Sequence, residues 1–290
     1  LVSAVSSSAL TLGAWIADGL KTERLEEENA KIDALGDNFA FNKQYIKMAL
    51  HLKENSLFSN DGLMVMISGK KDLGLRGINI KDLVNSKTEL RIAIRNETEN
   101  RRVLISTHDP QLKDNYQLIK IFLQATASPM GFLEPVRSGD CFFSDGMYPD
   151  LECIIQAGCD TIFIIDNDMP VVNHHLENLS WLRRMPYNIS IMHDDLMEKE
   201  IEKMLRLYPD FILIERNTET PWIKRCYKYF KSIAASAQRG NDTNLVPHRI
   251  IVISPEKTIG RLGTLEFSKG DLIAAVQHGY ECAEKAIQNL

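Results

Sequence analysis

The chain begins with LVSAVSSSAL at residues 1–10, and this stretch decides how the rest of the sequence is interpreted. Residues 1–5 form a short apolar run that only Ser3 interrupts, which is typical of a buried strand. From Ala9 onward the apolar residues recur at helical spacing up to Gly19, where a helix is expected to end. The sequence therefore predicts a strand that turns sharply into a helix, with three serines at the turn.

These serines lie where a nucleophilic serine would be exposed. A sharp strand-to-helix turn lifts a serine out of the sheet and aims a helix N-terminus at the negative charge that acyl transfer creates. The usual pattern for such a turn is G-x-S-x-G, and the corresponding residues here are Ala4-Val5-Ser6-Ser7-Ser8. The alternative interpretation is a plain serine-rich helix start, in which a hydroxyl group caps the helix.

The composition is that of an ordinary globular protein of 290 residues, with 44% hydrophobic and 25% charged residues. This length suits one large α/β domain or one domain with an appendage. A net charge of −5 gives no reason to expect a nucleic-acid partner. The five cysteines are odd in number and contain no C-x-x-C pair, which indicates reduced thiols. No apolar run in the sequence approaches the length that spans a bilayer.

Apolar strands alternate with amphipathic helices along the rest of the chain. Strand-like runs fall at residues 90–94, 103–105, 161–165, 211–214 and 249–253, and helical patterns at 116–127, 150–157, 176–184, 196–207, 222–237 and 271–288. This alternation argues for an α/β fold with a mainly parallel sheet that helices cover on both faces. Because the sequence contains no repeat and no convincing linker, we expect a single domain over residues 1–290.

A resemblance to a known family appears in the middle of the chain. Residues 125–136, ATASPMGFLEPV, are followed by Ser144-Asp145-Gly146. This block resembles the patatin family of lipid acyl hydrolases, which carry a segment close to A-T-S-A-x-P-G-F-F-P-P-V and then a hairpin that ends in the catalytic D-G dipeptide. Residues 1–10 fall where the family has its nucleophile elbow, and the match is collinear over nearly the whole chain.

The resemblance implies a three-layer patatin-like fold and a Ser-Asp catalytic dyad. Ser6 would attack the ester carbonyl, and Asp145 would take its proton and later activate a water molecule. The backbone N–H groups of Ser7 and of the helix start at Ser8 would stabilise the oxyanion. Ala4 and Ser8 replace the two glycines of the elbow, so we expect their Cβ atoms to crowd the turn.

Two further departures from the family lie beside these residues. Gly146 follows the aspartate as it does in the family, but Met147 stands where a second Gly or Ala is common. The family's glycine-rich oxyanion loop precedes the elbow, whereas this chain opens inside a strand without an initial Met. We therefore expect that the N-terminal part upstream of Leu1 is missing from this sequence.

Other polar residues permit competing interpretations. His248 or His278 would be the last member of a Ser-Asp-His triad, although His278 lies inside a helix and is expected to serve packing or the surface. Residues 173–175 and 193–195 are rich in His and Asp but lack ligand spacing on one element, so we expect polar surface. Residues 166–168 are expected to cap a strand rather than bind calcium. No metal and no cofactor are therefore expected.

The resemblance implies a phospholipase A-type hydrolase that acts on phospholipids at a membrane surface. Transient membrane contact would involve Phe142, Phe143, Met147 and Tyr148, and an activating protein partner fits the same picture. The expected location is a reducing compartment such as the cytoplasm, with peripheral membrane contact, or secretion as a toxin. The alternative function is a catalytically silent patatin-like module that binds lipid or protein.

Overall fold

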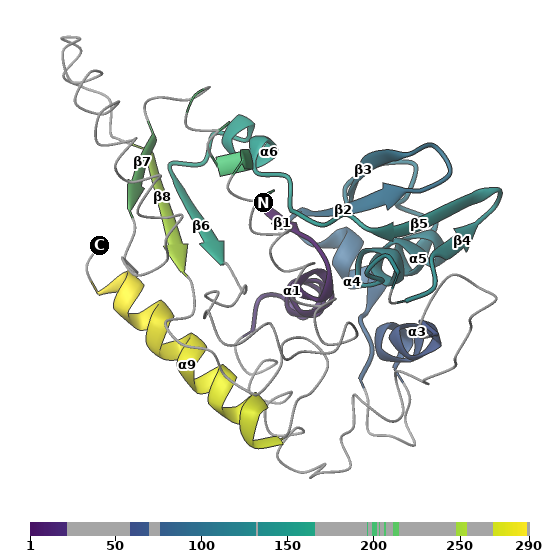
Figure 1. Cartoon of the computed structure of the whole chain (residues 1–290), viewed down its shortest axis with the longest axis horizontal. Coiled ribbons are helices and arrows are strands. Elements are labelled where there is room, and N and C mark those ends of the chain that lie inside the picture. The colour runs from purple at the N-terminus through teal and green to yellow at the C-terminus, as the bar shows by residue number, and fades with distance from the viewer. Residues whose placement is uncertain are drawn as a thin grey trace, which may run out of the picture. The chain divides into compact units, whose positions relative to one another are not determined.

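The computed structural model describes residues 1–21, 59–69, 76–131, 133–165, 211–214, 248–253 and 269–288, together with single helical residues between 196 and 206. Contacts divide the chain into two compact units, Leu1–Cys153 and Ile154–Leu290. Each unit is described by itself below, and Figure 1 labels their elements. The expectation of one domain over residues 1–290 stays a prediction.

The first unit contains a five-stranded mixed sheet. Its order is β1-β2-β5-β4, and β3 also pairs with β2. Only β1 and β2 are parallel, because short turns join β2 to β3 and β4 to β5, and such turns connect antiparallel strands. The strands are β1 (Val2–Ala4), β2 (Leu90–Asn96), β3 (Arg101–Ser106), β4 (Val136–Ser138) and β5 (Cys141–Asp145).

Both edges of β2 are occupied, and one edge carries two strands. β3 pairs with residues 91–96 along one edge of β2. β1 pairs with residues 90–92 and β5 with residues 94–96, so these two strands must share the other edge. Since β1 runs parallel to β2 and β5 runs antiparallel to it, their carboxyl ends face each other near Ala93.

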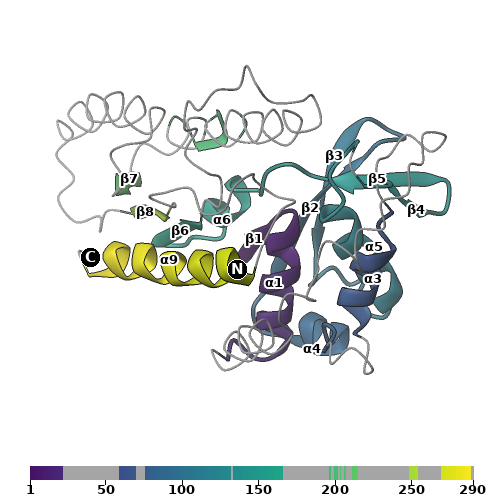
Figure 2. The same cartoon turned by 60° about the horizontal axis from the view of Figure 1, so that its bottom comes forward.

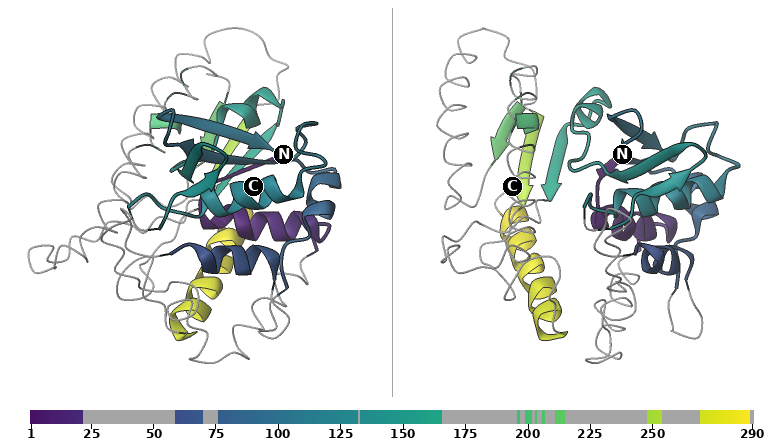
Figure 3. Two further views of the ribbon diagram at one scale, coloured as in Figure 1. Left: turned by 90° about the vertical axis from the view of Figure 1, so that its right-hand side faces the viewer. Right: turned by 45° about the vertical axis from the view of Figure 1, so that its right-hand side comes forward.

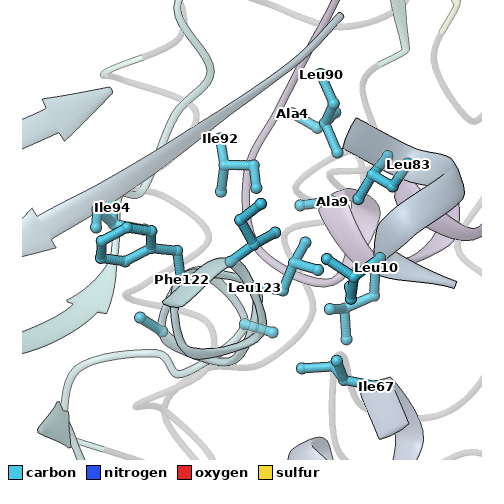
Figure 4. Close-up of a cluster of buried hydrophobic side chains, with 14 of the residues drawn as sticks. Ala4, Ala9, Leu10, Ile67, Leu83, Leu90, Ile92, Ile94, Phe122 and Leu123 are labelled. Carbon is cyan, nitrogen blue, oxygen red and sulfur yellow. The ribbon is translucent and has the colours of Figure 1, made fainter. Parts of the chain in front are cut away.

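The four described helices that lie wholly within this unit are on the same face of the sheet (Figures 2 and 3). α1 and α5 contact β2, α3 packs against α5, and α4 packs against both α1 and α5. Leu90, Ile92 and Ile94 alternate along β2 and are fully buried against this helical layer (Figure 4). Each such side chain contributes about 1.5–3 kcal/mol on burial, so their alternation fixes which face the helices cover. The helices are α1 (Ser7–Ala17), α3 (Asp61–Ser68), α4 (Ile80–Asn85) and α5 (Tyr116–Thr126).

The boundaries of α5 follow from local sequence. The Asn115 side chain accepts a hydrogen bond from the Leu118 N–H at 3.1 Å and so caps the helix start. Pro129 comes three residues after the last helical residue, which is consistent with a helix that cannot continue. The predicted helix at residues 116–127 and the predicted hairpin from 90 to 105 are both confirmed.

The second unit contains a parallel sheet of three strands in the order β6-β8-β7. These are β6 (Thr161–Ile165), β7 (Phe211–Ile214) and β8 (His248–Ile253), and α9 (Lys269–Ile287) contacts β8. The short helix α6 (Glu152–Gln156) crosses the boundary between the units in sequence. The expected parallel arrangement therefore holds here, whereas the sheet of the first unit is mixed. The helices expected at residues 176–184 and 222–237 lie outside the described residues.

Among the described residues, no helix has both the length and the apolar character needed to cross a bilayer.

Candidate active site

Ser6 lies between β1 and α1 in an unusual backbone conformation. Its φ is 58° and its ψ is −147°, near a region that is otherwise almost reserved for glycine. Such a conformation costs a residue with a Cβ about 1–3 kcal/mol, so the surrounding structure must enforce it. The predicted sharp turn from strand to helix is confirmed. Because the Ser6 side chain makes no capping hydrogen bond, the helix-cap alternative does not describe this residue.

Two hydroxyl groups hold the peptide that joins Val5 to Ser6. The Ser8 hydroxyl donates a hydrogen bond to the Val5 carbonyl, and the Ser6 N–H donates to Thr126 Oγ1 at 3.0 Å. The Ser6 carbonyl in turn accepts from the Ala9 N–H at 3.1 Å. Each bond contributes about 0.5–1.5 kcal/mol net. The two hydroxyl bonds together are thus comparable in free energy to the backbone strain that they hold in place.

The crowding expected from Ala4 and Ser8 is not found. Ala4 is the last residue of β1, and its side chain is 2% exposed within the hydrophobic core. Ser8 lies in the first turn of α1 and uses its side chain to close the turn onto Val5. Within residues 4–8 only Ser6 has a positive φ. The two residues that replace glycine therefore pack or bond instead of straining the elbow.

The elbow and Asp145 converge on one edge of β2. Ala4 lies opposite Ile92, and Asp145 lies opposite Ile94 on the same edge. Two residues along a strand span about 6.6–7 Å, so the ends of β1 and β5 are close neighbours. Ile92 and Ile94 point to the helical face, and paired residues share a face, so the Asp145 side chain belongs to the face that α1 covers. Ser6 begins α1 on this same side.

Ala93 lies between the two strand ends and is held from two directions. Its carbonyl accepts a hydrogen bond from Thr126 Oγ1 at 2.8 Å. The chain at Gly146 passes so near that a Cβ there would lie 2.5 Å from the Ala93 carbonyl carbon and oxygen. Only glycine fits at this position without a backbone shift. Glycine is therefore required at position 146 by the close approach of the chain to β2 and not by a positive φ.

Asp145 is buried, with 5% exposure, and several contacts orient it. Its N–H donates to the Ser128 carbonyl at 3.0 Å, and its Oδ1 accepts from the Met147 N–H at 2.8 Å. Hydrogen bonds among the described residues do not include one between Ser6 Oγ and the Asp145 carboxylate. The expected dyad therefore requires that Ser6 Oγ and the Asp145 carboxylate lie close enough for one water molecule to connect them. Hydrogen bonds between catalytic groups are often long when no substrate is bound.

The segment after Asp145 is attached to β3 and β1. Arg102 donates through Nη2 to the Tyr148 carbonyl at 2.7 Å, and its guanidinium lies 3.9 Å from the centre of the Tyr148 ring. The Asp150 N–H donates to Ser3 Oγ at 2.9 Å. These contacts hold the chain that leaves Asp145 beside the strand that leads to Ser6.

Ser7 and Ser8, the residues expected to donate hydrogen bonds to the oxyanion, lie at the start of a helix, as the sequence predicts. Ser7 and Ser8 form the first turn of α1, where backbone N–H groups have no partner within the helix. No hydrogen bond from either N–H to another described residue is present, and the helix dipole favours negative charge at this end. Their assignment as oxyanion donors stays a prediction.

The alternative histidines, His248 and His278, both belong to the second unit, so the triad alternative stays a prediction. His278 lies in α9 of the second unit, is 5% exposed and has its Nε2 3.5 Å from the Cys282 Sγ, in line with the expected packing role. His248 is the first residue of β8. Within the described ranges no group of three or more His, Cys, Asp or Glu could hold a metal ion. Residues 166–168, 173–175 and 193–195 lie outside those ranges.

Of the four residues expected to contact a membrane, Phe142 is the most exposed, at 43%. Phe143 packs edge-on against Phe122 with ring centres 5.7 Å apart, at the margin of the core. Tyr148 is covered by the Arg102 guanidinium, and Met147 is half-buried. Phe142 is thus the one aromatic of this set with a free face for a membrane.

Thr126 and Ser128 were missed as site residues by the sequence analysis. Both are fully buried, and both contact a segment that carries a dyad residue. The only signal in the sequence is their position inside the ATAS part of residues 125–136, which was noted as part of a resemblance and predicted no contact. No protein-family model matches the chain, and no curated protein matches it either.

Proposed function

We propose that this chain is a lipid acyl hydrolase of the phospholipase A type, with a patatin-like fold and a Ser6–Asp145 dyad. The observation that carries the proposal is the convergence of a strained serine and a buried aspartate at Ala93, from residues far apart in the sequence. A strained serine at a helix start is the backbone geometry that nucleophilic serines use. A structural serine would need neither the strain nor the aspartate.

The reaction proceeds in two acyl-transfer steps. Ser6 Oγ attacks the ester carbonyl while Asp145 accepts its proton, directly or through a water molecule. Negative charge develops on the carbonyl oxygen, where the N–H groups of Ser7 and Ser8 and the α1 dipole stabilise it. Asp145 returns the proton to the departing alcohol, which leaves an acyl group on Ser6. Asp145 then takes a proton from a water molecule, whose oxygen attacks the acyl carbonyl carbon. The bond between the acyl group and Ser6 Oγ breaks, the fatty acid leaves, and Asp145 returns its proton to Ser6 Oγ.

Phospholipid at a membrane surface is the proposed substrate. The exposed ring of Phe142 is on β5, the strand that ends in Asp145, and is the proposed membrane contact. Alternation along the strand points this ring to the face opposite the Asp145 side chain, so the lipid would reach the dyad around the edge of the sheet. Arg137 lies 5.9 Å from the centre of this ring, and a cation beside it suits the anionic phosphate layer of a membrane. The proposal needs no metal or cofactor, since the dyad and the backbone donors supply each proton transfer and charge contact.

The test is fatty-acid release from mixed phospholipid vesicles by the wild-type chain and by Ser6→Ala, followed by mass spectrometry of a fluorophosphonate adduct. Release by the wild type, loss in Ser6→Ala and an adduct on Ser6 would support the proposal. Release that persists in Ser6→Ala would contradict the choice of nucleophile.

The competing function is a catalytically silent module that binds lipid or protein. The absence of a direct hydrogen bond between Ser6 Oγ and the Asp145 carboxylate among the described residues is the observation in its favour. It predicts vesicle binding without fatty-acid release and without a fluorophosphonate adduct on any serine. Binding with neither reaction would therefore replace the enzymatic proposal by this one.

A further inference from the structure

We propose that Thr126 is a positioning residue for the nucleophile, and this inference rests on the function proposed above. Thr126 is the last residue of α5, is fully buried and lies 120 residues from Ser6 in sequence. Its hydroxyl is bonded to the elbow on one side and to β2 on the other. It touches neither the ester nor the attacking oxygen, so its effect on the reaction passes through the Ser6 backbone.

The directions of these two hydrogen bonds are fixed by the number of protons available. A threonine hydroxyl has one proton, and Thr126 donates it to the Ala93 carbonyl at 2.8 Å. Toward Ser6 the same oxygen can only accept, and it accepts the backbone N–H at 3.0 Å. Valine has the same shape but can do neither, whereas serine can do both. The role therefore depends on the hydroxyl and not on the volume of the side chain.

This hydroxyl resists a specific motion of the elbow. Rotation of the peptide between Val5 and Ser6 would change the φ of Ser6 and move its Oγ together with the Ser7 N–H. Thr126 holds the N–H side of this peptide, and the Ser8 hydroxyl holds its carbonyl side. Since a misplacement of about 1 Å at a reacting group costs on the order of 10²-fold in rate, a loosened peptide would slow attack by Ser6.

The same short segment also relates Ser6 to its base. Two residues beyond Thr126, the Ser128 carbonyl accepts the Asp145 N–H at 3.0 Å. Ser128 is in turn tied to α5, because its hydroxyl donates to the Gln124 carbonyl at 2.8 Å. Residues 126–128 thus bond the backbone of both dyad members, so Thr126 also helps to fix the separation between them.

The test compares Thr126→Val and Thr126→Ser in the full chain with a matched control, Thr107→Val. Thr107 is 1% exposed, and its Oγ1 accepts the Leu90 N–H at 3.0 Å, at the amino end of β2. The readouts are the rate of fluorophosphonate labelling at Ser6, kcat and KM for vesicle phospholipid, and the thermal unfolding midpoint. We expect Thr126→Val to lower labelling and kcat by about 10²-fold with KM nearly unchanged. Thr126→Ser should stay within about threefold of wild type.

Thr107→Val should lower the unfolding midpoint as Thr126→Val does, because both variants lose a buried hydrogen bond from a backbone N–H to a hydroxyl group. Ser6 in the Thr107→Val protein should nevertheless be labelled at the wild-type rate. Wild-type labelling in folded Thr126→Val, or an equal loss in Thr107→Val, overturns the positioning role alone. If the wild type is not labelled at Ser6 and does not release fatty acid, the proposed function is wrong, and the positioning role of Thr126 is then wrong as well.

Amide hydrogen exchange in the wild type keeps the inference testable even if Thr126→Val does not fold. The Ser6 N–H should exchange at least about 10²-fold more slowly than the Ser7 N–H, which has no partner among the described residues. Equally fast exchange at both positions would overturn the role without reference to catalysis.

Discussion

Two turns face each other at Ala93, and they are built in opposite ways. The first turn, residues 5–8, follows β1 and contains Ser6 at φ 58°. The second turn, residues 145–148, follows β5 and contains Met147 at φ 69°. Each turn thus places a residue other than glycine at a positive φ, two residues after a strand end.

The N–H of the residue at positive φ is bound by a distant segment in the first turn and by a neighbouring side chain in the second. The N–H at the strained residue of the first turn is bound by a buried side chain from α5. In the second turn the Asp145 carboxylate accepts the Met147 N–H, and the Tyr148 N–H donates to the Gly146 carbonyl at 2.9 Å. The proposed nucleophile thus depends on a contact from a distant segment, whereas the Asp145 carboxylate accepts a hydrogen bond within its own turn. The first turn should therefore be sensitive to remote substitutions and the second to local ones.

The largest effect is expected from Asp145→Asn, which changes the chemistry of the second turn but keeps its shape. Asparagine retains an oxygen that can accept the Met147 N–H, so the thermal midpoint should change little. Fatty-acid release should fall by about 10²–10⁴, the usual contribution of a general base. The control is Asp140→Asn in the exposed β4–β5 turn, which should release fatty acid like the wild type. More than half of the activity in Asp145→Asn would assign the base elsewhere.

The next largest effect is expected from a substitution at the close backbone contact between Gly146 and Ala93. Gly146→Ala would place a Cβ 2.5 Å from the Ala93 backbone, and strain of this kind costs about 1–3 kcal/mol in the free energy of unfolding. Chemical denaturation of Gly146→Ala and Gly279→Ala measures it. Gly279 lies in α9 with no heavy atom within 4 Å of its added Cβ, so alanine there should stabilise by about 0.5–1 kcal/mol. Equal stabilities of the two variants would show that β5 does not approach β2 this closely.

A smaller effect is expected when the local hydroxyl of the first turn is removed. Ser8→Ala loses the hydrogen bond to the Val5 carbonyl, which contributes about 1 kcal/mol, and should slow fluorophosphonate labelling of Ser6 by roughly tenfold. Ser8→Thr keeps a hydroxyl at this position and should label at close to the wild-type rate. Faster labelling in Ser8→Gly than in Ser8→Ala would mean that the Ser8 Cβ crowds the elbow, as the comparison with the glycine pattern had suggested.

The smallest effect is expected for the chemical modification of the Cys153 thiol, which lies in the segment after the second turn. Burial, reinforced by the neighbouring Asp150, raises the pKa of the Cys153 thiol to about 12. A raised pKa keeps the thiol protonated, so at about pH 8.5 its thiolate fraction is roughly 10³-fold below that of an ordinary cysteine. Iodoacetamide should therefore modify the half-buried Cys141 and Cys159 long before Cys153. Rapid modification of Cys153 would show that this segment opens readily.

Local pattern was enough to predict most elements of the first unit but not how they meet. The hairpin at 90–105, the helix at 116–127 and the turn at Ser6 were predicted because alternation and helical spacing are carried by neighbouring residues. The mixed sheet was not predicted, since the sharing of one edge of β2 by two strands depends on pairings between distant segments. The ATAS residues were recognised only as a motif.

The site residues follow the same division. Ser6 was named from a short elbow-like pattern, and Asp145 was named from the resemblance of residues 125–136 and 144–146 to the patatin family. The role of Thr126 has no local pattern, because its two partners lie 120 and 33 residues away. Crowding at Ala4 was expected from the missing glycine and was wrong, because the strain is confined to Ser6 and the Ala4 Cβ packs into the core.

The 120-residue separation between Ser6 and the hydroxyl that binds its N–H also sets an order of events during protein synthesis. The N-terminus leaves the ribosome first, long before α5 exists to accept that hydrogen bond. Until then the serine-rich stretch is an ordinary peptide, because a positive φ at serine does not persist without partners that enforce it. Contacts between distant segments also form slowly in folding. The turn at Ser6 therefore forms late in folding, and an incomplete nascent chain carries this serine without the backbone geometry on which its proposed reactivity depends.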